Sequence, residues 1–153
     1  GQWSPQINIG TSVLIPENYV SDLQLRLGLY RRLSTLIANE EIESFAAELI
    51  DRFGSFPEEV DHLLKVVTIK GLCREAGIQS IDAGPKGAVV KFRNDRFKNP
   101  AGLVGFINDQ GRNAKLRPDH KLVLIRDWPS PEIRLDGART LLVQLSKIAG
   151  QSS

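Results

Sequence analysis

Residues 48–57 read ELIDRFGSFP, and this stretch combines a helix end, a stop signal and a cluster of charged side chains. Apolar residues leading into it recur at the spacing that forms one stripe on an α-helix; these are Ile42, Phe45, Ala46, Leu49 and Phe53. Gly54 stands where helices commonly end in a left-handed conformation, and Pro57 suits the first turn of a following helix. The stretch therefore predicts a helix that ends near residue 53 and another that begins near residue 57.

Three charged residues of this stretch, Glu48, Asp51 and Arg52, lie on the side of the predicted helix opposite the apolar stripe. Glu48 and Arg52 are one turn apart with the acid first, which is the order that favours an ion pair. Exposed pairs are common and contribute little stability, so one interpretation is an ordinary solvated helix face. The alternative is a docking face, on which a guanidinium and two carboxylates pair with complementary groups of another domain. Helical spacing alone does not decide between them.

The rest of the chain predicts an α+β fold, in which three N-terminal helices are followed by a β-β-α-β-β-α unit. Asp22 is expected to cap the first helix, which we predict to run to about residue 38 with an apolar face made of Leu23, Leu27, Tyr30, Leu33 and Ile37. Two short-strand hairpins, each followed by a helix, predict a small antiparallel sheet packed with helices. The predicted later elements are strands 78–83 and 88–93, helix 100–110, strands 114–117 and 121–127, and helix 131–148.

Length and composition favour one globular domain. The chain has 153 residues, of which 41% are hydrophobic and 25% are charged, and this is ordinary for a protein with its own core. We expect residues 1–14 to be the extended end of an interdomain linker and residues 15–153 to form a single domain. No apolar run approaches membrane-spanning length, so we expect no membrane partner. The first residue is Gly and Met is absent, which suggests a piece of a larger protein.

Few residues have the patterns of catalysis or metal binding. The lone cysteine, Cys73, lies on a predicted helix and is interpreted as a small semi-buried apolar residue. His62 and His120 have no ligand partners at metal-binding spacing and are interpreted as ordinary polar residues, so we predict no metal site. Gly84-Pro85-Lys86-Gly87 resembles a hairpin turn and lacks the helix and hydroxyl of a phosphate loop. We therefore expect no catalysis and no bound cofactor in this chain.

Charge is distributed unevenly along the chain. Residues 1–77 carry a net charge of −4, whereas residues 86–126 carry a net charge of +7. The basic segment keeps open an alternative function as a nucleic-acid-binding module, since cations that neutralise phosphates supply non-specific affinity. Phe92 and Phe97 are interleaved with the basic residues, but Phe92 alternates with Lys91 and Arg93 and is expected to point into the core.

Several motifs together resemble those of a known family. Ile15-Pro16-Glu17-Asn18-Tyr19-Val20 is followed by Asp22, by Arg26-Leu27 and by Tyr30-Arg31-Arg32, and then by Glu48 to Gly54 and Pro57 to Val60. In this order they resemble the C-terminal domain of the bacterial transcription-repair coupling factor, Mfd. The resemblance extends from about Ile15 to Ala149, and in the second half it rests on Gly77-Ile78, the Gly84 to Gly87 turn and Asn99-Pro100.

The resemblance implies a regulatory role in transcription-coupled nucleotide excision repair. The family's full-length protein is an ATP-driven, helicase-like DNA translocase that displaces stalled RNA polymerase and recruits UvrA, and it is cytoplasmic. The resemblance implies that the C-terminal domain is autoinhibitory: it docks on a UvrB-like domain of the same protein, masks UvrA binding and restrains the motor. The family's docking residues correspond here to Glu48, Asp51 and Arg52. ATP and Mg belong to the motor domains, and the isolated domain is expected to be a monomer.

Overall fold

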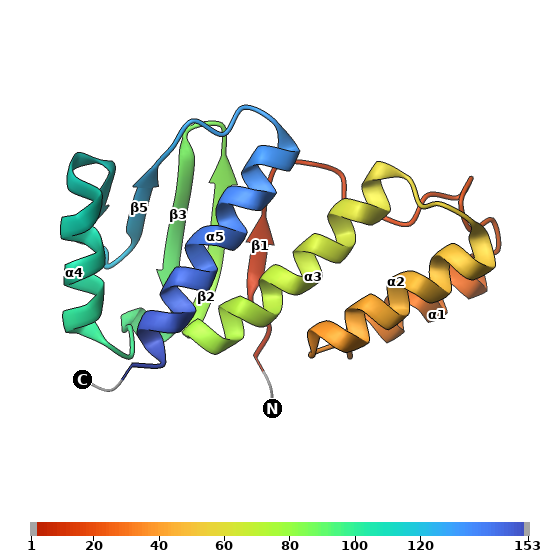
Figure 1. The fold of residues 1–153 in the computed structure, drawn as a ribbon, viewed down its shortest axis with the longest axis horizontal. Helices are drawn as coiled ribbons and strands as arrows, with labels where there is room; N and C mark the ends of the chain where they lie inside the picture. Colours follow the sequence, from red (N-terminus) through yellow and green to blue (C-terminus); the bar gives the residue numbers. More distant parts are fainter. Residues whose placement is uncertain (1–2, 152–153) are drawn as a thin grey trace. The chain divides into compact units, whose positions relative to one another are not determined.

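The computed structural model describes residues 3–151, and these form two compact units (Figure 1). One unit, here called the helical unit, comprises residues 12–71. The other, here called the sheet unit, comprises residues up to 11 and from 72 onward. The boundary falls within the third helix, between Gly71 and Leu72.

The helical unit contains α1 (Leu23–Leu33), α2 (Asn39–Phe53) and most of α3 (Glu58–Ala76). Their apolar faces share one core, with Val20 and Ile15 from the segment before α1. The buried members are Ile15, Val20, Leu29, Leu33, Ile42, Phe45, Leu49, Val60 and Leu64. This core confirms the predicted stripe of α2 at its three innermost positions.

The first helix differs most from its prediction. The Asp22 carboxylate caps it as expected, accepting a hydrogen bond from the Leu25 amide at 2.9 Å. The helix ends at Leu33, however, so Ile37 lies beyond it and is 65% exposed. Leu23 and Leu27 are also exposed, because the core contacts of α1 are made by Leu29 and Leu33. The predicted apolar face of this helix was therefore wrong except at Leu33 and the half-buried Tyr30.

The C-terminal end of α2 follows the predicted signal, and its start is stabilised by a side chain of its own first turn. At its start, the Glu41 carboxylate accepts a hydrogen bond from the Ala38 amide at 3.0 Å, which satisfies one of the donors left open at a helix N-terminus. At its end, Gly54 has φ 87° and its amide donates to the Ile50 carbonyl at 2.9 Å. A side chain at this φ would be strained, so glycine stops the helix here.

The sheet unit contains five strands in the order β1-β2-β3-β5-β4. They are β1 (Gln6–Asn8), β2 (Ile78–Gly84), β3 (Gly87–Phe92), β4 (Ala114–Leu116) and β5 (Leu122–Ile125). The β2–β3 and β4–β5 hairpins are antiparallel, as predicted, and β3 pairs antiparallel with β5. The sheet is nevertheless mixed, because β1 pairs parallel with β2, with Ile7 opposite Ile81. The α+β class and the β-β-α-β-β-α order are confirmed, and the wholly antiparallel sheet is corrected.

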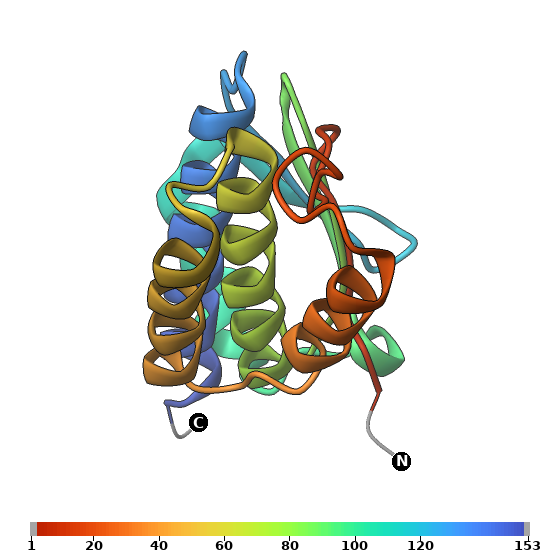
Figure 2. The same ribbon diagram turned by 90° about the vertical axis from the view of Figure 1, so that its right-hand side faces the viewer.

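Two helices accompany the sheet, α4 (Pro100–Gln110) and α5 (Pro131–Ala149). Helix α5 runs along one face of the sheet (Figures 1 and 2), and four of its leucines are buried: Leu135, Leu141, Leu142 and Leu145. Asn99 links the two helices: its side-chain oxygen caps α4 at the Gly102 amide, and its amide nitrogen donates to the Ile148 carbonyl, both at 3.0 Å. Gly87 is required in the hairpin because an added Cβ would overlap the carbonyl oxygen of Leu124.

A buried arginine attaches the segment that contains β1 to the rest of the sheet unit. Arg134, near the start of α5, is 7% exposed and donates to the Ile9 carbonyl at 2.9 Å and to the Trp128 carbonyl at 3.2 Å. A buried guanidinium must satisfy its donors, so these hydrogen bonds hold the backbone at residues 9 and 128 in place. The segment that the sequence suggested as a linker end thus contains β1 and one of the sheet unit's anchors.

Candidate docking surface

The charged residues of the Glu48–Gly54 stretch lie on the outer side of α2. Leu49 is 1% exposed and points into the core, whereas Asp51 and Arg52 are exposed. Glu48 is intermediate, with 35% of its side chain accessible. The structure therefore confirms the predicted outward face for Asp51 and Arg52 and shows Glu48 to be more enclosed. Phe53, predicted to be buried, is half-buried because it is the last residue of the helix.

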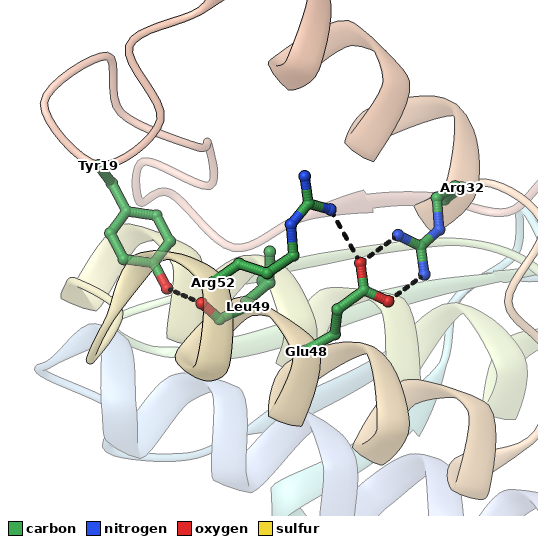
Figure 3. A network of polar contacts seen from close by, with 5 residues as sticks. All are labelled: Tyr19, Arg32, Glu48, Leu49 and Arg52. Atoms are coloured by element: carbon green, nitrogen blue, oxygen red, sulfur yellow. Dashed lines mark hydrogen bonds and ion pairs between the residues drawn. The ribbon is translucent and has the colours of Figure 1, made fainter.

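The predicted Glu48–Arg52 ion pair is present, and the structure adds a second arginine to it (Figure 3). Arg52 approaches Glu48 Oε2 at 3.1 Å. Arg32, in the last turn of α1, donates through Nη1 to Oε2 at 2.6 Å and through Nη2 to Oε1 at 2.8 Å. This two-bond geometry is the strong form of an arginine–carboxylate contact. One carboxylate is thus held between guanidinium groups from two helices.

Electrostatics at this carboxylate follow from its neighbours. The hydrogen bonds from Arg32, and secondarily from Arg52, lower the pKa of Glu48 to about 2. The same hydrogen bond raises the pKa of Arg32. Glu48 is therefore ionised throughout the neutral range, and the three side chains together carry one net positive charge. The ionised state follows from two directed donors, since burial alone would raise the pKa of a carboxylic acid.

Both guanidinium groups rest on aromatic rings. Arg32 lies over Phe45, with 4.9 Å between its central carbon and the ring centroid, and Arg52 lies over Phe53 at the same distance. Cation–π contacts of this kind contribute about 0.5–1 kcal/mol at exposed sites. They also restrict the long side chains, because a guanidinium on a ring face has fewer orientations than one in water. The charged cluster is therefore ordered before any partner binds.

Tyr19 fixes the end of α2 next to this cluster (Figure 3). Its hydroxyl is within donating distance of two carbonyl oxygens, those of Leu49 at 3.1 Å and Gly54 at 2.6 Å. Its ring is 5.8 Å from that of Phe53. Burial raises the pKa of the Tyr19 hydroxyl, so it remains a donor at neutral pH. The last turn of the helix, which carries Asp51 and Arg52, is held at its open carbonyl end.

Asp51 differs from its neighbours. Within residues 3–151 it makes no side-chain hydrogen bond or ion pair, and it is exposed. Its carboxylate is thus available to a cation, whereas that of Glu48 already accepts three hydrogen bonds. Of the three predicted docking residues, the structure brings Glu48 and Arg52 into one network and leaves Asp51 beside it. Arg32 was missed as a partner because no local spacing links it to Glu48, which is sixteen residues away.

The basic segment of the sheet unit lacks the features of a base-stacking surface. Phe92 is 2% exposed, which confirms its predicted inward direction, and it packs against the buried Phe97 with ring centroids 5.2 Å apart. Neither ring is available to a nucleotide base. The turn at Pro85 and Lys86 joins β2 to β3 as a hairpin, as the sequence predicted.

The remaining candidate residues are not members of the charged cluster. Cys73, predicted to be semi-buried, is fully buried, and burial raises its pKa to about 12, which leaves it a poor nucleophile. His62 was interpreted as an ordinary polar residue, but it is 2% exposed, with Nε2 at 3.9 Å from Glu58 Oε1. His120 is exposed in the β4–β5 turn with φ 67°. Among the described residues, no helix is long and apolar enough to cross a membrane.

Known proteins resemble this chain over most of its length. The family model of the TRCF domain matches residues 9–103. The transcription-repair-coupling factor of Rickettsia bellii is 45% identical over 147 residues, which cover 94% of this chain and 13% of that protein. The factor of Escherichia coli strain K12 is 27% identical over 144 residues, or 94% of this chain and 12% of that protein. The chain thus spans about an eighth of the length of these curated relatives.

A solved structure shares the fold. The crystal structure of the C-terminal domain of a transcription-repair coupling factor superposes with a TM-score of 0.80, covering 99% of this chain and 97% of that one at 18% identity. At this identity the match supports the architecture, and the family assignment rests on the sequence matches. The α+β arrangement of helices and mixed sheet is therefore one already seen in a coupling-factor domain. On the match of residues 9–103, this chain belongs to the TRCF domain family.

Proposed function

We propose that this chain is the non-catalytic, autoinhibitory domain of a cytoplasmic transcription-repair coupling factor. In this proposal it docks on a UvrB-like domain of the same protein, masks the surface that binds UvrA and restrains an ATP-driven DNA translocase that displaces stalled RNA polymerase. The docking residues are Glu48, Asp51 and Arg52. The observation that carries the proposal is the ordered charged cluster on the outer side of α2, in a chain of this family.

The physical properties of this cluster suit a releasable contact. An interdomain interface that opens on a signal is expected to be polar and moderate in size, and charged pairs give it orientation more than raw affinity. Within residues 3–151, Arg52 has unused N–H donors and Asp51 has an unpaired carboxylate, so a partner that presents the complementary charges gains directed contacts. The cluster is held by neighbouring rings and by Arg32, which lowers the entropy lost on docking.

The test uses the full-length parent protein with Glu48→Gln, Asp51→Asn and Arg52→Gln combined. Removing one side of a desolvated charge pair costs about 2–5 kcal/mol, so the closed state should lose about 1.5 to 3.5 orders of magnitude in population relative to the open state. UvrA should then bind the variant more tightly than the wild type. ATP turnover without polymerase should rise, and deletion of residues 15–153 should produce both effects.

Glu43→Gln is the matched control. Glu43 is exposed on the same helix, and its neutralisation changes the net charge by +1, as the triple substitution does. This control should leave UvrA binding and ATP turnover at wild-type values. If UvrA affinity is unchanged in both the triple variant and the deletion, this domain is not the mask and the proposal fails.

A further inference from the structure

We infer that Arg32 on α1 is a fourth member of the docking surface, a positioning residue that holds Glu48 and, through it, Arg52 in the orientation that the partner recognises. The inference rests on the proposed function. It adds a residue outside the Glu48–Gly54 stretch and makes the docking surface a composite of two helices. The geometry of the shared carboxylate is the observation behind it.

Arg32 makes the stronger contact with Glu48. Its two hydrogen bonds, of 2.6 and 2.8 Å, engage both carboxylate oxygens, whereas Arg52 makes one hydrogen bond of 3.1 Å to Oε2 alone. A two-point contact fixes the plane of the carboxylate, which one bond does not. Because Arg52 donates to an oxygen that Arg32 already holds, the direction of the Arg52 guanidinium depends on Arg32 as well as on the Phe53 ring beneath it.

Arg32 is itself fixed by groups other than Glu48. Its guanidinium lies over the ring of Phe45, a side chain that is 2% exposed and belongs to the core shared by the three helices. It also stands in the last turn of α1, where a positive charge is favoured by the helix dipole. The Phe45 ring, fixed in the core, thus helps to hold Arg32 and, through it, the Glu48 carboxylate. A docking partner therefore meets charges that are already placed.

Arg32 also sets the charge that a partner encounters. Glu48, Asp51 and Arg52 alone carry a net charge of −1, whereas with Arg32 the surface is neutral overall. Three of the roughly four acceptor positions of the Glu48 carboxylate are occupied inside the domain. Asp51 is unpaired among the described residues, so a cationic partner side chain finds its acceptor there, while Glu48 serves chiefly to place the two guanidinium groups.

The test compares Arg32→Gln with Arg31→Gln in two settings. Arg31 is the adjacent exposed residue in the same helix turn, so its substitution makes the same change in charge and helix-end electrostatics. In the 153-residue chain, the pKa of Glu48 is measured by NMR titration of its side-chain carboxyl carbon. In the full-length parent, UvrA affinity reports how far the docked state is populated.

Arg32→Gln should raise the pKa of Glu48 from about 2 toward its ordinary value near 4.5. It should also increase UvrA affinity by about five- to fiftyfold, as expected for residues in one ion-pair network. Arg31→Gln should change neither quantity. Arg32→Lys keeps the charge without the two-point fork, and it should show most of the effect of Arg32→Gln on UvrA affinity.

A double-mutant comparison separates positioning from direct contact. If Arg32 acts through Glu48, then Arg32→Gln should have no further effect on UvrA affinity when Glu48→Gln is already present. The inference is overturned if Arg32→Gln raises the Glu48 pKa but leaves UvrA affinity unchanged while Asp51→Asn and Arg52→Gln increase it; the proposed docking then stands without Arg32. If no substitution of these four residues changes UvrA affinity, docking through this surface is itself refuted, and the role of Arg32 falls with it.

Discussion

The helical unit and the basic segment of the sheet unit both carry many charges, but they hold them differently. In the helical unit, two arginines from two helices converge on the Glu48 carboxylate, and both rest on aromatic rings. In the sheet unit, residues 86–126 have a net charge of +7, yet several cations are engaged one at a time: Arg117 with Asp119, Arg93 over Trp3, and Arg126 with Gln110.

The comparison shows that net charge does not locate an interaction surface. A basic segment whose cations have separate local contacts offers diffuse attraction, which salt screens. A cluster in which several side chains fix one another offers direction, which a specific partner can recognise. On this criterion the acidic N-terminal half, with its few arginines, carries the better candidate surface.

The largest expected effect concerns the core beneath the charged cluster. Phe45→Ala should lower the free energy of unfolding by about 3–5 kcal/mol, because Phe45 is 2% exposed and its loss leaves a cavity. It also removes the ring under Arg32. Phe53→Ala should cost less, about 1–2 kcal/mol, since Phe53 is half-buried at the helix end. Denaturant unfolding followed by circular dichroism measures both values.

Which of the two substitutions lowers the free energy of unfolding more is the decisive result. Equal losses would mean that the end of α2 is as tightly packed as its middle, and a larger loss for Phe53→Ala would reverse the assignment of the buried face. A third variant, Phe92→Ala, provides the comparison with the sheet unit, because Phe92 is equally buried and, among the described residues, lies under no ion-pair cluster.

A second test uses the pH dependence of stability. The folded-state pKa of Glu48 is lowered to about 2 from an ordinary value of 4.5, so its ion pairs stabilise the fold fully above about pH 4.5 and are lost as the pH falls toward 2. The difference in unfolding free energy between the wild type and Glu48→Gln should therefore shrink across this window. Urea titrations at pH 7, 4 and 2.5 measure it, and a difference that grows on acidification would contradict the assigned network.

The sequence predicted more of the fold than of the site. The β2–β3 hairpin follows from a local signal, the glycines of the Gly84 to Gly87 turn, and the helix over residues 100–110 begins with a Pro after the capping Asn99. Strand β1 was not predicted, because three residues that alternate in exposure have no distinct pattern. The face of α1 was misassigned because leucines at 23, 25, 27 and 29 fit more than one helical stripe.

At the site, contacts between residues close in the sequence could be predicted, and contacts between distant residues could not. The Glu48–Arg52 pair is one helical turn long and could be predicted from spacing. The Arg32–Glu48 contact depends on how α1 and α2 pack in the helical core, which no periodicity encodes. A sequence gives the members of a local pair, whereas an ion pair between helices requires the tertiary structure.

A third test measures duplex DNA binding, for which we expect a small effect. The basic segment should bind labelled duplex weakly at low salt and negligibly at physiological salt, since counterion release supplies affinity but Phe92 and Phe97 are buried and cannot stack on bases. Fluorescence anisotropy at two salt concentrations measures this. Lys91→Gln with Lys115→Gln, two exposed sheet residues, should weaken the low-salt binding further. Sub-micromolar binding that persists at moderate salt would instead support a nucleic-acid-binding module.

The smallest expected effect is the response to ATP. Lys86 lies between glycines, as in a phosphate loop, but it stands in a hairpin that joins two antiparallel strands. A phosphate loop needs a following helix whose N-terminal amides face the phosphates, together with a hydroxyl for magnesium. After Gly87 the chain continues as β3, so those amides pair with neighbouring strands. Titration calorimetry of the 153-residue chain with ATP and magnesium should therefore show no saturable heat, and Lys86→Ala should give the same flat trace. A micromolar isotherm that Lys86→Ala abolishes would place a nucleotide site at this turn and overturn the assignment of a purely regulatory domain.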